Sequence, residues 1–78
     1  VVKIESVFEY TISSLGHISI AIYDEEGIEV QSLFTGIVHQ KGSCRLKYTF
    51  NTQHLPPGKY YIRMSTNNVV EKQEEILF

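Results

Sequence analysis

The sequence predicts a small all-β fold, an antiparallel β-sandwich of six or seven short strands. Apolar and polar residues alternate with a period of two along most of the chain, and short turn-forming stretches separate the alternating segments. No stretch supports a helix of about ten residues. With 78 residues the chain is long enough for one domain, residues 1–78. Short strands with regular turns indicate an immunoglobulin-like arrangement, without the disulfide and tryptophan of true immunoglobulin domains.

The first two strands are predicted at residues 7–12 and 17–23, joined by a turn at 13–16. β-Branched residues fit a half-buried sheet, so the apolar set of each strand is predicted to face the core. The inward set of these strands is Phe8, Tyr10, Ile12, Ile18, Ile20 and Ile22. The outward set of the second strand is His17, Ser19, Ala21 and Tyr23.

The second strand is predicted to continue into a β-hairpin. "DEEG" (24–27) contains three acids and a glycine, a composition that stops a strand and forms a tight turn. "IEVQSLF" (28–34) resumes the alternation, with Ile28 and Val30 predicted to face inward.

A β-bulge near Ser32 could change the phase of this strand and bring Leu33 or Phe34 inward. Residues 35–43 contain two glycines and several polar side chains, so they are predicted to form a looser connection.

Two more strands are predicted at residues 44–50 and 59–65, connected by "NTQHLPPG". Pro57 fixes φ and Gly58 supplies a positive φ, which predicts a type II turn that sets the register of the second of these strands. Leu55 is expected to pack beneath this corner. The inward set is Cys44, Leu46, Tyr48, Phe50, Tyr60, Ile62 and Met64. The outward set is Arg45, Lys47, Thr49, Tyr61, Arg63 and Ser65.

The chain is predicted to end in a last hairpin strand. Asn67-Asn68 is a candidate two-residue turn, since asparagine tolerates positive φ. "VVEKQEEILF" (69–78) has apolar ends and a charged middle. Charges on an edge strand resist edge-to-edge pairing. The same strand could instead be a recognition element that another protein reads by adding a strand.

Composition excludes several classes of function. The net charge is −2, and the seven basic residues are scattered, so neither nucleic acid nor an anionic membrane is a predicted partner. No apolar run approaches the roughly 20 residues of a membrane helix. The single cysteine, Cys44, excludes an internal disulfide and is predicted to be a small buried hydrophobe.

No group of residues predicts catalysis, a cofactor or a metal. The histidines (His17, His39 and His54) lie far apart and lack a second ligand at metal spacing. The acids around Gly27 only partly match a calcium loop, so a solvated turn is the favoured interpretation. No serine or cysteine has a base arranged beside it. We therefore predict that the chain is not an enzyme.

Two motifs resemble the type IX secretion C-terminal sorting domains of Bacteroidetes. In "FEYTISSLGHISIAIYDEEGIEV" the residues at that family's first motif are Ile18, Ile20, Ile22, Tyr23, Asp24, Gly27 and Val30. In "LPPGKYYIRM" the residues at its second motif are Leu55, Pro56, Gly58, Tyr60, Arg63 and Met64. The match covers roughly residues 7–78. The immunoglobulin-like domain of flagellar hook-capping proteins shares these motifs.

The resemblance implies a noncatalytic, seven-stranded sandwich at the C-terminus of a secreted protein. Such domains are read by an outer-membrane translocon and typically cut off by a sortase-like peptidase, and the cargo is attached to surface lipopolysaccharide. The implied partners are these proteins and the rest of the parent chain, with no nucleic acid and no membrane insertion. The implied location is secreted or the surface of a Gram-negative bacterium, via the periplasm. The residues implied to carry the signal are Gly58, Tyr60, Arg63, Val70, Lys72 and Leu77.

Two alternatives remain open at this point. The chain opens on Val1-Val2 without an initiator methionine, so we expect it to be excised from a larger protein, and the resemblance implies that it comes from the C-terminus of that protein. It could then be an accessory module of a secreted enzyme that binds glycan or packs against another domain, or it could be a structural assembly domain. The glycan version predicts that Tyr23 and Tyr61, both in the outward set, are exposed together on one face.

Overall fold

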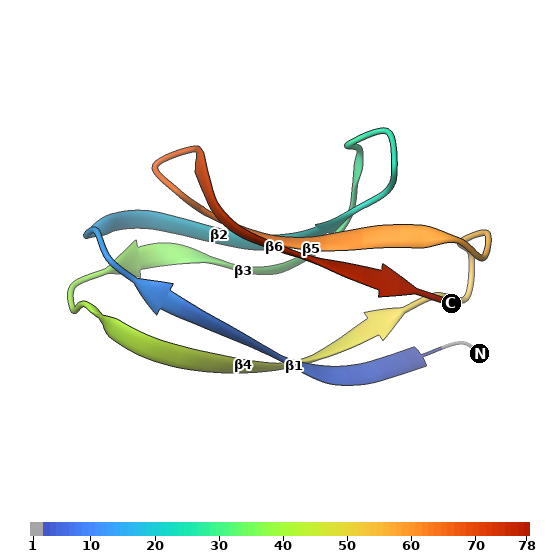
Figure 1. Cartoon of the computed structure of the whole chain (residues 1–78), viewed down its shortest axis with the longest axis horizontal. Coiled ribbons are helices and arrows are strands. Elements are labelled where there is room, and N and C mark those ends of the chain that lie inside the picture. Colours follow the sequence, from blue (N-terminus) through green and yellow to red (C-terminus); the bar gives the residue numbers. More distant parts are fainter. Residues whose placement is uncertain (1–2) are drawn as a thin grey trace.

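Six antiparallel strands form two packed sheets in the computed structural model (Figure 1). The structure describes residues 3–78, so Val1 and Val2 lie outside it. The strands are β1 (Lys3–Ile12), β2 (Gly16–Tyr23), β3 (Glu29–Val38), β4 (Gly42–Asn51), β5 (Lys59–Thr66) and β6 (Val69–Leu77). The predicted all-β sandwich is confirmed. The resemblance implied seven strands, and the described residues form six.

The two sheets are unequal in size. Strands β3, β2, β5 and β6 lie side by side in that order, and β1 pairs with β4 to form the second sheet. The central strands β2 and β5 pair without a register shift, from Ile18 opposite Thr66 to Tyr23 opposite Tyr61. Since each has a neighbour on both sides, these two strands are the centre of the larger sheet.

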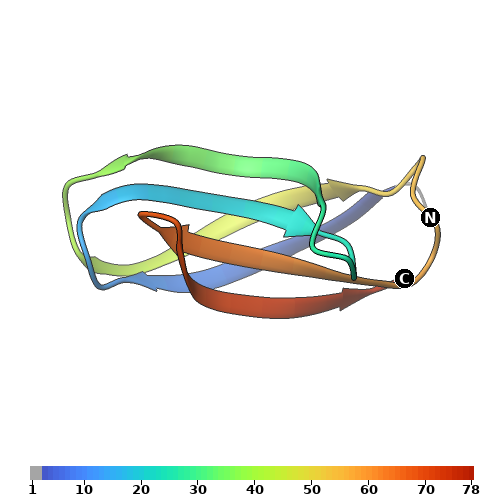
Figure 2. The same ribbon diagram turned by 90° about the horizontal axis from the view of Figure 1, so that it is seen from above.

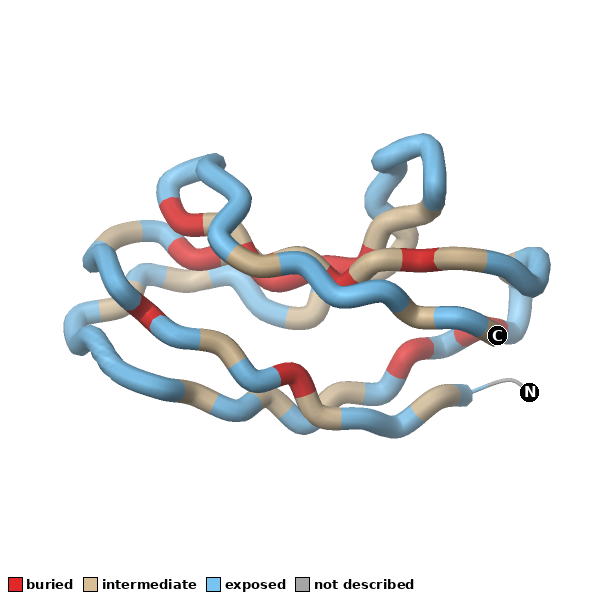
Figure 3. Tube along the Cα trace, viewed as in Figure 1, coloured by how far each residue is buried: buried red, intermediate tan, exposed pale blue. Residues whose placement is uncertain are grey.

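The core lies between the two sheets (Figure 3). Its fully buried side chains come from β1, β2, β4 and β5, in the alternation that the sequence predicted. They are Phe8, Ile18, Ile20, Ile22, Phe50, Ile62 and Met64. Tyr10, Cys44, Leu46 and Tyr48 are half-buried and pack against this core, as does Leu55 beneath the corner. The predicted inward sets of these four strands are therefore confirmed.

Two side chains have an exposure that the alternation did not predict. Ile28 was predicted to face inward, but it is 58% exposed because it closes the turn, where its backbone N–H donates to Asp24 Oδ1. Ala21 was predicted to face outward, and its pairing with Arg63 places it on the outer face, but it is only 1% exposed. It lies on a central strand opposite Arg63, and a methyl side chain beside so long a neighbour has little area to expose.

Strand β3 is longer and less regular than predicted. The predicted bulge is confirmed, because Ile20 pairs with Phe34 and Ala21 pairs with Ser32, which leaves Leu33 as the extra residue. Leu33 packs against the core. A second bulge leaves Val30 unpaired in the same way. The predicted loose connection over 35–43 is wrong for all but residues 39–41, since β3 runs on to Val38 and β4 begins at Gly42.

The turns depend on residues with positive φ. Asn67 (φ 50°) and Asn68 (φ 68°) form the predicted two-residue turn between β5 and β6. Gly27 (φ 81°) closes the acidic turn after β2, where its N–H donates to the Asp24 carbonyl. Gly58 also has a positive φ, but at 152° it is far from the value of roughly 80° that a type II turn requires. That predicted turn type is wrong, because Gly58 extends the strand and pairs with Phe78.

The sandwich has two open sides, where an edge of one sheet runs past an edge of the other. At the β3–β4 side, Gln31 Nε2 donates to the Thr49 carbonyl at 2.7 Å and Gln31 Oε1 accepts from Asn51 N–H at 3.0 Å. One amide side chain thus satisfies two backbone groups of β4. Residues 3–78 contain no helix that is long and apolar enough to cross a bilayer.

Candidate recognition surface

Gly58 and Tyr60 fix the end of the terminal hairpin. Gly58 and Phe78 exchange two backbone hydrogen bonds, at 2.9 and 3.2 Å. Tyr60 is 4% exposed, and its hydroxyl donates to the Pro56 carbonyl at 2.7 Å. Its ring stacks on Phe78 at 5.2 Å and meets Phe50 edge-on at 5.5 Å. Both residues therefore act by holding the C-terminal end of β6 on the core.

Arg63 lies on the outer face of the larger sheet. Its Nε donates to Gln73 Oε1 at 2.9 Å, and its guanidinium lies 4.3 Å from the centre of the Tyr23 ring. Tyr23 and Tyr61 are direct cross-strand partners. The glycan hypothesis placed them together on one face, which is where they lie, but both are half-buried. Arg63 also occupies one face of the Tyr23 ring, the kind of surface on which a sugar would stack.

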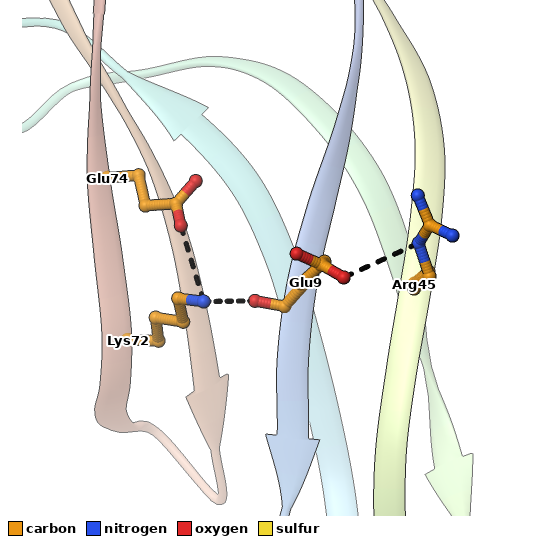
Figure 4. A network of polar contacts seen from close by, with 4 residues as sticks. All are labelled: Glu9, Arg45, Lys72 and Glu74. Atoms are coloured by element: carbon orange, nitrogen blue, oxygen red, sulfur yellow. Dashed lines mark hydrogen bonds and ion pairs between the residues drawn. The ribbon is translucent and has the colours of Figure 1, made fainter.

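Lys72 lies at the other open side, between β6 and β1 (Figure 4). Its ammonium donates to the backbone carbonyl of Glu9 and lies 3.2 Å from a carboxylate oxygen of Glu74. It also lies 5.3 Å from the centre of the Phe8 ring. Lys72 therefore joins the two sheets where no strand pairing does so, as Gln31 does on the opposite side.

A hollow of about 570 Å³ opens beside this contact. Its lining includes Glu9, Tyr10, Cys44, Arg45 and Lys72. Burial raises the pKa of Tyr10 above its ordinary value of 10.0, with smaller contributions from the charge of Cys44 and a hydrogen bond to it. Glu9 and Arg45 form an exposed ion pair at 3.5 Å on the outer side of β1 and β4. The hollow is thus lined by charges of both signs.

Val70 and Leu77 are exposed at opposite ends of β6, at 51% and 66%. Seven residues of an extended strand separate them by on the order of 20 Å. Arg63 and Lys72 also lie apart, one on the outer face and the other at the side facing β1. The six residues implied by the resemblance are therefore spread along the β5–β6 hairpin and do not meet at one point.

The free edge of β6 can be assigned from its hydrogen-bonding pattern. Gly58 and Phe78 form a hydrogen-bonded pair, and such pairs alternate with non-bonded pairs along an antiparallel ladder. The register then makes Gln73, Glu75 and Leu77 the non-bonded positions opposite β5. Their backbone N–H and C=O groups point away from β5. A partner strand could pair with these groups.

Other polar groups stabilise the fold. Asp24 Oδ1 accepts the backbone N–H groups of Glu26 and Ile28, so this carboxylate stabilises the turn. Residues 3–78 contain no cluster of three or more His, Cys, Asp and Glu side chains placed to hold a metal ion.

Sequence reasoning missed the two contacts across the open sides. Gln31 lies beside a bulge that moves it to the inner side of β3, opposite Ile22. Lys72 had been singled out from the resemblance, but its contact with Glu9 depends on the two strands being neighbours in space. A polar residue at an inward position of an edge strand is the signal that could have identified Lys72, whereas the bulge hides the inward position of Gln31 from the alternation.

Comparison with known proteins assigns the chain to a family. The model of the "Secretion system C-terminal sorting domain" family matches residues 5–77. No curated protein and no solved structure gave a significant match. The family match spans nearly the whole chain, including both motifs singled out in the sequence and the hairpin that carries the six residues. The chain therefore belongs to the family of C-terminal sorting domains of the type IX secretion system.

Proposed function

We propose that this chain directs its parent protein through the type IX secretion machinery to the cell surface, and that it does so as a noncatalytic signal. The match of the sorting-domain family over residues 5–77 carries the proposal. The family is one of sorting signals, whose members belong to secreted or cell-surface proteins of Bacteroidetes. The signal acts by being recognised, so its outer surface and strand edges are the functional parts.

The recognised element in this proposal is the β5–β6 hairpin. Its free edge offers the backbone groups of Gln73, Glu75 and Leu77 to a partner strand, with Arg63 and Gln73 on the adjoining outer face. Strand addition gives affinity through main-chain hydrogen bonds and specificity through alternate side chains. Gly58, Tyr60 and Lys72 support recognition indirectly, since they hold β6 in place.

The partners in this proposal are the outer-membrane translocon, a sortase-like peptidase and the rest of the parent chain. The domain of residues 1–78 follows a secreted protein, passes through the periplasm with it and is removed at the surface. No nucleic acid, cofactor or membrane insertion enters this mechanism. The small net charge of −2 is consistent with a protein partner.

A reporter fusion tests the sorting role. Residues 1–78 are placed at the C-terminus of a periplasmic reporter in a bacterium that has this pathway. We expect the reporter to reach the cell surface, and the same fusion to remain periplasmic in a strain without the translocon. A wild-type fusion that stays in the periplasm of the competent strain would contradict the sorting role.

A substitution at the free edge tests the recognition mode separately. Glu75→Pro removes an N–H that points away from β5, so the ladder to β5 keeps its hydrogen bonds, and proline is tolerated at such edge positions. Glu75→Gln is the matched control, because it removes the same charge and keeps the N–H. We expect the proline variant to fold and to lose surface delivery, and the glutamine variant to keep both. Equal delivery of the two variants would reject strand addition at β6 and leave the sorting role intact.

A further inference from the structure

After Glu29 at its first position, strand β3 is an edge strand without the charges that the other edges carry. Along the edge strands β1, β4 and β6, charged residues occur at short intervals: Lys3, Glu5, Glu9, Arg45, Lys47, Glu71, Lys72, Glu74 and Glu75. From Val30 to Val38, β3 carries none. Charged side chains and bulges are the usual protection of an edge against pairing with another strand. The edge of β3 therefore depends on its bulges alone.

Those bulges protect only the first half of β3. They lie at Val30 and Leu33, and Gln31 in the same half is tied to β4. From Phe34 to Val38 the strand pairs with β2 in unbroken register. This straight segment runs along the rim of the molecule (Figure 2). It is a regular edge of five residues available for strand addition.

Apart from Thr35, the side chains of this segment are apolar, and they are partly exposed. Ile37 is 60% exposed and Phe34 is 38% exposed. Gly36 lies between them, and the position that its Cβ would occupy is 3.1 Å from the Phe34 ring. The Phe34 ring therefore lies over the bare backbone of Gly36, which gives the segment a smooth surface.

We propose that the Phe34–Val38 edge pairs with the same edge of a second copy of this chain, antiparallel about a twofold axis at Gly36. The midpoint of the straight segment sets this register, in which Phe34 meets Val38 of the other copy and Thr35 meets its Ile37. Aromatic with β-branched and β-branched with β-branched pairs are favourable across strands. Repulsion between like charges does not oppose this pairing, because the segment has no charged side chain. The two four-stranded sheets then form one continuous sheet.

The expected dimer is weak. Five residues on each side bury less surface than the roughly 1,200 Å² of a stable interface. Dimerisation should therefore appear only at high protein concentration. The inference does not depend on the sorting role, since it rests on the edge of β3 and the proposed recognition rests on that of β6.

Two isoleucines provide a matched test. Ile37 and Ile28 have nearly equal exposure, 60% and 58%, but Ile37 lies in the pairing segment and Ile28 in the acidic turn. Sedimentation velocity of the wild-type chain, from micromolar to millimolar concentration, should show a monomer–dimer equilibrium. Ile37→Lys should weaken it by about tenfold or more, because each added charge meets an apolar strand. Ile28→Lys should leave it unchanged.

Amide hydrogen exchange locates the contact. In an antiparallel pair only alternate N–H groups point to the neighbour, so the amides of residues 34–38 that point away from β2 should gain protection as concentration rises. A wild-type chain that stays monomeric at all concentrations would overturn the proposal. It would also be overturned by an Ile37→Lys variant that dimerises like wild type, or by concentration-dependent protection in β6 instead of β3.

Discussion

The fold alters the ionisation of Tyr10. Its pKa is raised above 10.0, first by burial and then by Cys44 beside it. The folded chain therefore holds the phenolic proton to a higher pH than the unfolded chain does. A group of this kind contributes stability that is present below its unfolded pKa and is lost as the pH rises towards its folded pKa.

Replacement of Tyr10 should therefore change the response to alkali. For wild type, the free energy of unfolding should fall as the pH rises above about 10. Tyr10→Phe should reduce the steepness of this fall, because the group that titrates differently in the two states is gone. Urea unfolding at a series of pH values measures this slope.

The substitution Cys44→Ala separates the two causes of the raised pKa of Tyr10, burial and the neighbouring thiol. Burial is the largest cause and remains after this substitution, so the slope should change less than in Tyr10→Phe. A Cys44→Ala slope as shallow as that of Tyr10→Phe would show that the thiol, and not burial, dominates the behaviour of Tyr10.

At the level of elements, the corner before β5 shows how one backbone conformation positions a strand pair. Gly58 has a φ of 152° and makes both backbone bonds to Phe78. The position that its Cβ would occupy has no atom within 4 Å. The need for glycine here comes from the backbone conformation and not from crowding.

Gly58→Ala should therefore destabilise the chain by about 1–3 kcal/mol, because an L-residue rarely adopts this φ. Gly36→Ala is the comparison, since its new Cβ crowds the half-exposed Phe34 ring without a positive φ. Gly36→Ala should lower the free energy of unfolding by less than Gly58→Ala does, because the Phe34 ring can move. Chemical denaturation measures both values, and the Gly58 variant should also show faster amide exchange at Phe78. An equal loss in the two variants would mean that crowding, not conformation, sets the cost.

The elements differ in how far the sequence predicts them. Strands β2 and β5 follow the strict alternation, because each buries one face completely and a one-residue slip would expose that whole face. Reasoning from strict alternation fails for strand β3. Its bulges change the phase twice, and Gly36 and Thr35 look like loop residues although they continue the strand to Val38. Alternation of apolar and polar residues with a period of two identifies a regular strand but does not identify an irregular one.

At the level of the whole molecule, the two sheets meet along two sides, β3 beside β4 and β6 beside β1, where no strand pairing joins them. The residues of the terminal hairpin were indicated by the resemblance, and their roles emerge only from contacts in the folded chain. Lys72 illustrates this, since its acceptor is the backbone carbonyl of Glu9, which no side-chain pattern can reveal. Contacts between distant strands depend on the folded arrangement, so local periodicity predicts the sheets better than it predicts their junctions.

If Lys72 joins the sheets, its loss should loosen the β1–β6 side. Lys72→Met keeps the apolar stem and removes the donor, and we expect a loss of about 1–2 kcal/mol in the free energy of unfolding, reduced by the partial exposure of the site. Amides of β6 should exchange faster, while those of β2 should keep the protection of the global core.

Glu9→Gln is the control for this prediction, because it keeps the backbone carbonyl that Lys72 contacts. It removes only the exposed ion pair with Arg45, whose side chains are 71% and 70% accessible, so it should change stability little. Urea denaturation and hydrogen exchange of both variants test whether the Lys72 ammonium or the Glu9 carboxylate links the two strands. If Glu9→Gln were as costly as Lys72→Met, the carboxylate would be the link between the strands; if Lys72→Met were neutral, the packing of Phe8 and its neighbours alone would hold β6 against β1.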